Sequence, residues 1–367
     1  MSGRGVVIGK FHPFHRGHQH VIERALELCG RITVIVCAQR SQPLAGELRR
    51  EWIARVIPAA EVLLVDQDEL GLADDDTDGW ARATLDVLGE RPASVFTSES
   101  YGDAYAAALG CEHVSVDPGR EVFPISGREV SAEPLGHLDA LPAEVRADFA
   151  RRVCVLGAES TGKTTLAQAL AEHLRTPWVP EYGRPFTELE RPTRESVWTA
   201  ADFMHIARMQ SWLEDFLAGQ AERVLVCDTD LFVTARFHEV YLGEPPPAAL
   251  EEAARLRPYD LYLLCDVTTT FRQDRGLTRR EGDHRRWMHE QYLEYVRNAA
   301  APHLVLAGDR RERLDAAAAA VANLLERPVD LAAVSAAALA RLDANRLLGG
   351  YPVSTSTFTQ PSSTRTG

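Results

Sequence analysis

Short apolar runs alternate along this chain with longer stretches in which apolar residues recur every three or four positions. Apolar runs rich in Val and Ile predict buried strands, and the 3.6-residue periodicity predicts amphipathic helices. Such alternation is typical of a parallel, doubly wound sheet. The first series predicts strands at Val6–Phe11, Ile32–Ala38, Val62–Val65, Val95–Thr97 and His113–Val116.

A second series of the same kind begins after residue 150. It predicts strands at Val153–Leu156, Trp178–Val179, Val224–Cys227, Leu261–Cys265 and Leu304–Leu306. We therefore expect an α/β protein with two doubly wound parallel-sheet domains, residues 1–137 and 153–330, joined by a helical connector at 138–152. Residues 331–367 are expected to hold a loosely placed helix at Leu331–Leu348 and a disordered Ser/Thr-rich tail.

Composition and charge narrow the class of protein. The length of 367 residues favours two domains. The net charge of −13 argues against a general affinity for nucleic acid or anionic membranes. No apolar run is long enough to span a bilayer, and the N-terminus lacks the apolar core of a signal peptide, so we expect a cytoplasmic protein. The six cysteines form no CxxC pair and are expected to be buried free thiols.

Histidines cluster directly after the first predicted strand, with four of the twelve between His12 and His20. Open parallel sheets bind ligands at this edge. His15 and His18, at the start of the next helix, can reach a phosphate chain, and an imidazolium there would stabilise a transferring group. Capping or surface histidines, or a zinc site, are the alternatives. The candidates are Lys10, His15 and His18 for catalysis, and Gly9, Phe11, His12 and Gly17 for nucleotide binding.

A second motif, Gly157–Thr164, matches G-x-x-x-x-G-K-[ST] between a predicted strand and a predicted helix. In this context the backbone N–H groups cradle phosphates, Lys163 reaches the β- and γ-phosphates, and Thr164 can hold Mg²⁺. The sequence therefore predicts an ATP site. Its nucleotide-binding candidates are Gly157, Glu159, Ser160, Thr161, Gly162, Lys163, Thr164 and Thr165.

Residues after the next strands predict the rest of a phosphotransferase site. Asp228 ends a buried strand where a Mg²⁺-binding aspartate is expected, and Asp230 is a candidate for substrate ribose, although both could be helix caps. Glu181 is a candidate general base, and a structural Glu–Arg pair is its alternative. Tyr182 and Arg184 are expected to contact substrate. The Arg-rich segment 272–286 is either a solvated face or a lid whose Arg275, Arg279 or Arg285 meets ATP.

These motifs resemble a known family. His15–His18 after the first strand is similar to the HxGH signature of nucleotidylyltransferases. The segments Gly46–Ile53, Val95–Gly110 and Phe123–Gly127 look like the nicotinamide mononucleotide adenylyltransferase domain of NadR-type bifunctional proteins. The second-half motifs Gly157–Thr164, Glu181–Arg184 and Asp228–Asp230 resemble the ribosylnicotinamide kinase of the same family, so the likeness extends over about residues 5 to 327.

The resemblance implies a NAD-salvage enzyme that uses ATP and Mg²⁺. One half would phosphorylate nicotinamide riboside, and the other would join nicotinamide mononucleotide to the AMP part of ATP, releasing pyrophosphate. The histidines and Lys10 would contact the ATP phosphates. The expected partners are small molecules, with a homo-oligomer possible and no nucleic acid, because this chain begins at its first strand without the helix-turn-helix that some members carry.

One signature departs from the family. In the family, ISGT or IST is followed two residues later by an arginine that binds ATP phosphates. Here Ser126 and Gly127 are kept, but Arg128 holds the Thr position and Ser131 holds the Arg position. We expect Ser126 and Arg128 to bind nucleotide. A kinase joined to a silent nucleotide-binding domain and a nucleotide sensor remain the alternatives.

Overall fold

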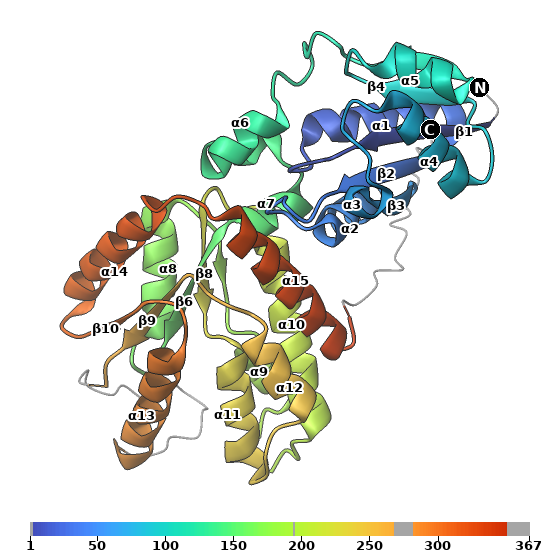
Figure 1. Ribbon diagram of the computed structural model, residues 1–367. Coiled ribbons are helices and arrows are strands. Elements are labelled where there is room, and N and C mark those ends of the chain that lie inside the picture. The colour runs from blue at the N-terminus through green and yellow to red at the C-terminus, as the bar shows by residue number, and fades with distance from the viewer. Residues whose placement is uncertain (1–2, 194, 268–281, 351–367) are drawn as a thin grey trace, which may run out of the picture.

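The computed structural model describes residues 3–193, 195–267 and 282–350. Two parallel five-stranded sheets are present in this part of the chain, each with helices on both faces (Figure 1). Their strand orders are β3-β2-β1-β4-β5 and β10-β9-β6-β8-β7. The doubly wound architecture predicted from the sequence is confirmed. The predicted tail beyond residue 350 lies outside the described residues.

The first half forms around β1, whose residues Val6 and Val7 are buried between helices on the two faces. Because β1 lies between β2 and β4, the strand order reverses beside it, which is where open α/β sheets bind ligands. The elements are β1 (Gly3–Gly9), α1 (Arg16–Cys29), β2 (Gly30–Ala38), α2 (Gly46–Val56), β3 (Glu61–Asp66), α3 (Gln67–Leu70), α4 (Thr77–Leu88), β4 (Ser94–Thr97), α5 (Gly102–Leu109), β5 (Glu112–Ser115), α6 (Gly127–Ala132), η1 (Pro134–Gly136), η2 (Leu138–Ala140) and α7 (Ala143–Phe149).

The second half repeats the plan, with β6 between β8 and β9. Its central strands are buried apart from Arg151 at the start of β6, as the apolar runs predict. The elements are β6 (Arg151–Leu156), α8 (Lys163–Leu174), β7 (Trp178–Val179), α9 (Gly183–Glu190), α10 (Ala200–Ala218), β8 (Val224–Asp228), α11 (Leu231–Leu242), α12 (Ala248–Arg255), β9 (Leu261–Cys265), α13 (Gly282–Asn298), β10 (His303–Leu306), α14 (Arg310–Leu325) and α15 (Leu331–Leu347).

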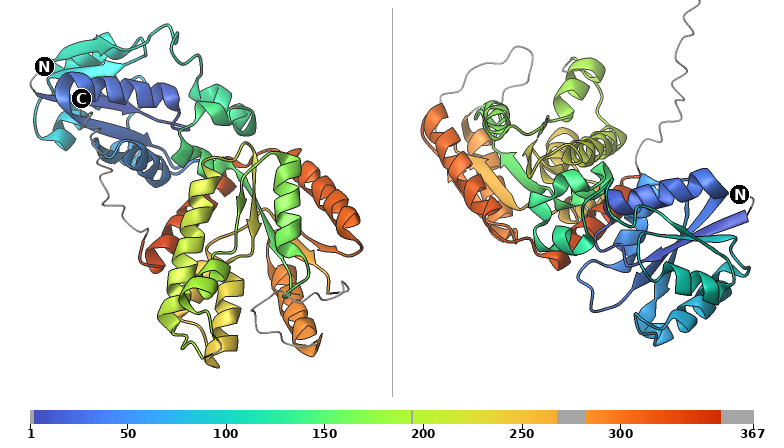
Figure 2. Two further views of the ribbon diagram at one scale, coloured as in Figure 1. Left: turned by 180° about the vertical axis from the view of Figure 1, so that it is seen from behind. Right: turned by 90° about the horizontal axis from the view of Figure 1, so that it is seen from above.

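The closing helix α15 is not loosely placed, contrary to the prediction. It packs against α2 and α7 as well as α12, and Val334 and Ala338 belong to the apolar core of the first half (Figures 1 and 2). The Ser335 hydroxyl accepts a hydrogen bond of 2.9 Å from the backbone N–H of Ala45. An Ala-rich helix has small side chains that allow close approach on several sides, which a search for one apolar stripe does not detect.

A buried carboxylate joins the halves. Asp148 of α7 accepts hydrogen bonds from Trp52 (2.8 Å) and Arg55 (3.2 Å) of α2 and from Arg341 (3.1 Å) of α15. Burial acts to raise the pKa of Asp148, but the two guanidinium groups outweigh it, and the pKa lies below the usual range. Asp148 is therefore ionised and fully paired where three elements meet.

Two further findings concern cysteines and membranes. All six cysteines are free thiols, and Cys111 alone among them is not classed as buried. Among the described residues, none of the helices combines the length and apolarity needed to cross a membrane.

Candidate active sites

The larger of two cavities, of about 630 Å³, lies at the carboxyl end of β1. Its wall also includes the end of β4 and the turn into α5, and the first residues of α6. The sequence-predicted residues that line it are Gly9, Lys10, Phe11, His12, His18 and Arg128, and those that the sequence did not single out include Gln67, Asp74, Trp80, Thr97, Glu99 and Tyr101. Gln67, Asp74 and Trp80 come from α3, α4 and the loop between them, which carry no motif. Thr97, Glu99 and Tyr101 lie in the Val95–Gly110 segment, to which the sequence analysis assigned a resemblance but no single site residue.

His15 and His18 form a reciprocal cap at the start of α1. The Nδ1 atom of His15 accepts from the Gly17 N–H at 3.1 Å, and Nδ1 of His18 accepts from the His15 N–H at 3.3 Å. The two rings stack with centroids 3.7 Å apart. The capping alternative is thus confirmed, and it coexists with a place in the site, because His18 lines the cavity while His15 packs behind it.

Both imidazoles are neutral in this arrangement. Burial, assisted by the charge of Arg120, lowers the pKa of His15 to about 4. Burial, with His15 and Arg120, lowers the pKa of His18 well below 6.5. Because each Nδ1 is an acceptor, each Nε2 carries the proton and is a hydrogen-bond donor. These rings therefore offer neutral N–H groups to a phosphate instead of the expected imidazolium charge, and positive charge would come from other side chains.

Two cations in the cavity wall can supply that charge. Lys10 pairs with Asp74 at 2.6 Å, and this hydrogen bond holds the pKa of Asp74 below its usual range. Arg128 stands in the first turn of α6 and, among the described residues, makes no ion pair. Ser131, at the family's arginine position, donates its hydroxyl to the His12 carbonyl at 3.1 Å. Ser126 caps α6, and neither Ser126 nor Gly17 lines the cavity.

Arg49 fixes the loop that carries Lys10. This arginine of α2 is fully buried and donates to the Lys10 carbonyl and, at 3.2 Å, to the Cys37 carbonyl. Because a loop carbonyl is held by a rigid helix, the direction of the Lys10 side chain is constrained before any ligand binds.

The second site is built on the loop between β6 and α8. Ser160 and Gly162 adopt left-handed φ values of 56° and 86°, which turn successive backbone N–H groups toward one side. Thr161 closes the loop by donating its hydroxyl to the Ala158 carbonyl at 2.8 Å. The loop therefore has the concave form that binds phosphates, as the motif predicts. Lys163 opens α8 and is 8% exposed, whereas Thr165 is exposed on the same helix.

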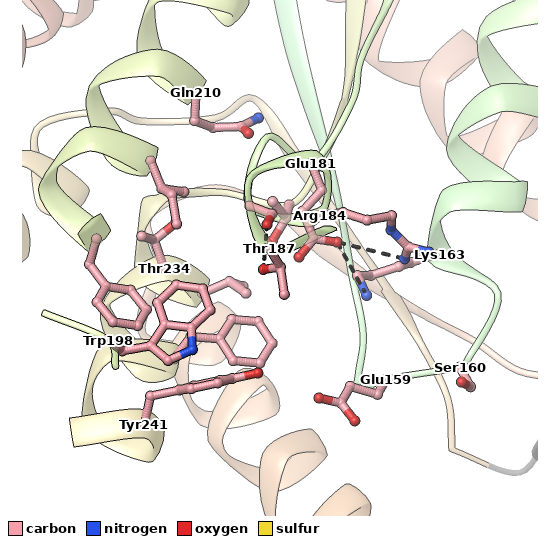
Figure 3. A pocket seen from close by; sticks show the side chains of 16 residues that line it. Glu159, Ser160, Lys163, Glu181, Arg184, Thr187, Trp198, Gln210, Thr234 and Tyr241 are labelled. Atoms are coloured by element: carbon pink, nitrogen blue, oxygen red, sulfur yellow. Dashed lines mark hydrogen bonds and ion pairs between the residues drawn. The ribbon is translucent and has the colours of Figure 1, made fainter. Parts of the chain in front are cut away.

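Lys163, Glu181 and Arg184 form a small charge cluster (Figure 3). Glu181 lies 3.9 Å from the Lys163 ammonium and 4.0 Å from the Arg184 guanidinium. Burial acts to lower the pKa of Lys163, but the carboxylates of Glu181 and Asp228 outweigh it and raise that pKa. The lysine is therefore charged at neutral pH and placed to neutralise phosphate.

Thr164 and Asp228 offer a site for a hard cation. The Thr164 hydroxyl donates to Oδ2 of Asp228 at 2.5 Å, and Oδ1 of this buried carboxylate has no partner among the described residues. Burial raises the pKa of Asp228 to about 6, so a nearby cation would favour its ionised form. An oxygen pair beside a phosphate site is what Mg²⁺ prefers, with phosphates and water completing its shell.

A pocket opens beside this cluster, and its far end is aromatic (Figure 3). The Trp198 ring is tilted against the rings of Tyr241 and Phe203, with centroids 4.9 and 5.1 Å away, and Phe237 completes the wall. The sequence analysis missed these residues, because they are scattered over α10, α11 and the loop before α10. A flat apolar ring fits this end, and a group facing Lys163 fits the other.

The remaining residues predicted for the second site are Glu159, Ser160, Tyr182 and Asp230, and only the first two line the aromatic pocket. Glu159 and Ser160, expected at the nucleotide, line the aromatic pocket together with Glu181 and Arg184. Tyr182 bonds to His205 at 3.2 Å and does not line the pocket. Asp230 is buried and caps α11 by accepting from the Val233 N–H at 3.0 Å through Oδ1, and it does not line the aromatic pocket; its contact with substrate ribose stays a prediction.

Of the three arginines predicted to form a lid, only Arg285 lies within the described residues. Arg275 and Arg279 lie outside the described residues. Arg285, in the first turns of α13, donates to the backbone carbonyl of Glu159 at 3.1 Å. At least one arginine of the predicted lid segment therefore reaches the phosphate-binding loop.

Comparisons with known proteins match both halves. Residues 6–78 match a family model described as cytidylyltransferase-like, and residues 152–313 match one described as an AAA domain. The trifunctional NAD biosynthesis/regulator proteins NadR of Salmonella typhimurium and Escherichia coli are each 29% identical over 291 residues, covering 74% of this chain and 70% of the relative. The chain is a homologue of NadR.

Solved NadR structures share the fold over nearly the whole length. A NadR protein in complex with NR has a TM-score of 0.67 at 21% identity, covering 90% of this chain and 98% of that chain. A NadR protein in complex with NAD and AMP-PNP has a TM-score of 0.63 at 20% identity, with the same coverage. The two-sheet arrangement described above is therefore the NadR fold.

Proposed function

We propose that the chain is a bifunctional NAD-salvage enzyme. Its second half phosphorylates nicotinamide riboside, and its first half adenylylates the resulting mononucleotide to NAD, releasing pyrophosphate. The observation that carries this function is the pairing of a phosphate-binding loop with an adjoining pocket that is charged at one end and aromatic at the other. The NAD-biosynthesis role of the similar NadR proteins supports it.

In the kinase half, the aromatic end would hold the nicotinamide ring, and the 5′-hydroxyl would face Glu181. This carboxylate would accept the hydroxyl proton as the oxygen attacks the γ-phosphorus and ADP leaves. Lys163 and Arg184 would neutralise charge on the phosphoryl oxygens. Thr164 and Asp228 would hold Mg²⁺, which supplies further charge neutralisation when bound. Positioning and electrostatics account for the catalysis, without a covalent intermediate.

Replacing Glu181 with Gln tests the proposed base. We expect kcat for riboside phosphorylation to fall about 10²–10⁴-fold, because an amide cannot take the proton. The KM for ATP should change little, since the phosphate-binding loop is intact. Steady-state kinetics with nicotinamide riboside measure both. The exposed Glu172→Gln on α8 is the matched control, and an unchanged kcat in Glu181→Gln would move the base to Glu159 of the same pocket.

In the adenylyltransferase half, a phosphate oxygen of the mononucleotide would attack the α-phosphorus of ATP in line with departing pyrophosphate. The Nε2–H group of neutral His18 would donate to a phosphate oxygen, with His15 fixing its ring. Lys10 and Arg128 would supply the positive charge that the imidazoles do not carry. Exchange of the Lys10–Asp74 pair for a Lys10–phosphate pair fits this role.

A second candidate function rests on Ser131. Its hydroxyl is committed to the His12 carbonyl, so no arginine reaches the phosphates from that position. In this alternative the first half binds nucleotide without turnover and the chain is a ribosylnicotinamide kinase or a nucleotide sensor. Release of pyrophosphate from nicotinamide mononucleotide and ATP separates the two functions.

The same proposal includes the partners and the cellular location of the enzyme. We infer small-molecule partners, a cytoplasmic location and no nucleic-acid partner, in keeping with the net charge of −13. Self-association is compatible with this function and is not required by either site, because each described site is formed within one chain.

A further inference from the structure

A buried arginine lies beside the phosphate-binding loop of the kinase half. Arg313, at the end of the first turn of α14, is 4% exposed, and α14 packs against α8, the helix that follows this loop (Figure 1). Its three hydrogen bonds all go to backbone carbonyls, those of Gly308 at 3.0 Å, Thr161 at 2.9 Å and Asp266 at 3.4 Å. One guanidinium therefore joins the segments that follow β10, β6 and β9, which are neighbouring strands.

The surroundings of Arg313 are unfavourable for a positive charge. In the described part of the chain it forms no ion pair with a carboxylate, and a buried charge without such a partner is costly. The dipole of α14 also opposes a cation near the start of the helix. The three carbonyl dipoles compensate the charge in part. A triphosphate in the adjoining loop would complete the compensation, because opposite charges attract strongly where water is excluded.

The hydrogen bond to Thr161 sets the direction of the next amide in the loop. The C=O and N–H groups of a trans peptide point in opposite directions, so holding the Thr161 carbonyl on Arg313 turns the Gly162 N–H away from α14. Gly162, with a φ of 86°, has no side chain that could hold this peptide plane. Backbone N–H groups of such a loop cradle the phosphates. Arg313 therefore fixes one N–H group of the cradle before nucleotide binds.

We propose that Arg313 is a positioning residue for the phosphate chain of ATP, acting through the Gly162 N–H and adding positive charge behind the loop. The inference rests on the proposed kinase function. Arg313 lines neither of the two cavities described above, so it acts on the nucleotide without forming part of the acceptor pocket. Its loss should therefore weaken the use of ATP and leave the use of riboside unchanged.

Steady-state kinetics of Arg313→Gln test this role. We expect the KM for ATP in riboside phosphorylation to rise about 10–100-fold, because a neutral amide lacks both the charge and the fork of donors. The KM for riboside should stay within about 2-fold of the wild-type value, and adenylyl transfer should be unchanged. A residue that only maintains the fold would lower the amount of active enzyme, and hence kcat, without raising one KM. Arg223→Gln is the matched control, because Arg223 is exposed and donates to the Leu325 carbonyl at the other end of α14.

Arg313→Lys keeps the buried charge but loses the fork that reaches three carbonyls. The KM for ATP should rise less than in Arg313→Gln, by about 3–10-fold, and this variant carries the test if the Gln variant does not fold. A KM for ATP within about 2-fold of wild type in each variant that folds, or an equal rise in the KM for riboside, would overturn the inference and leave the kinase standing. No phosphorylation of riboside by the wild type would overturn the kinase function itself.

Discussion

Replacing Lys163 with Met is expected to lower riboside phosphorylation by about 10²–10³-fold or more while adenylyl transfer continues at its wild-type rate. Lys163 is the buried cation at the start of α8, and loss of one such preorganised charge costs at least this much. Its removal also leaves the carboxylates of Glu181 and Asp228 without the ammonium that offsets their charge. Parallel assays of ADP formation with riboside and of pyrophosphate release with mononucleotide measure the two reactions.

The reciprocal variant is His18→Ala, which should abolish adenylyl transfer and spare the kinase. His20→Ala on the same helix is its control, because His20 does not line the cavity. Loss of both activities in either variant, with the fold intact, would contradict two independent sites. Full adenylyl transfer in His18→Ala would show that the histidine site is wrongly assigned.

Replacing Asp148 with Ala is expected to lower the free energy of unfolding by about 3–5 kcal/mol. The side chain is 8% exposed and pairs with Arg55 and Arg341, which are themselves largely buried, so its loss leaves two desolvated guanidinium groups without their carboxylate. Trp52 loses the acceptor of its ring N–H as well. Urea denaturation followed by fluorescence and by circular dichroism gives this free energy.

The matched control for that variant is Asp343→Ala on α15. Its carboxylate pairs with Arg346 at 2.8 Å but is 59% exposed, so we expect a loss of about 0–1 kcal/mol. If Asp148→Ala were no more costly than Asp343→Ala, the junction of α2, α7 and α15 would not depend on the buried carboxylate. Separate unfolding transitions of the two halves in Asp148→Ala alone would support its joining role further.

The parts of the fold that the sequence predicted are those with local signals. Each central strand is a contiguous apolar run, and the phosphate-binding loop is contiguous with the strand and helix that position it. The order of strands in each sheet then brings Thr164 and Asp228 together, because both follow neighbouring strands at one edge. Physical rules that act over a few residues, with parallel pairing, are sufficient for these predictions.

The rest depends on tertiary environment. The aromatic end combines residues from α10, α11 and a loop, and no spacing links Trp198 to Tyr241 before the helices pack. The protonation state of His15 follows from burial and from Arg120, which the local sequence does not reveal. Asp230 shows a local signal instead, because one of its carboxylate oxygens caps α11, while its role toward substrate stays a prediction. The sequence therefore predicted where the motifs lie, but it did not predict the protonation state of the histidines.

The most direct test of the central claim is a product assay on the purified protein with ATP, Mg²⁺ and nicotinamide riboside as the sole acceptor. The account predicts that nicotinamide mononucleotide forms first, and that NAD and pyrophosphate follow from the same chain. Mononucleotide that accumulates without NAD, even when supplied directly, would contradict the bifunctional claim and leave a kinase joined to a silent nucleotide-binding half. ATP hydrolysis without either product would contradict the salvage function altogether.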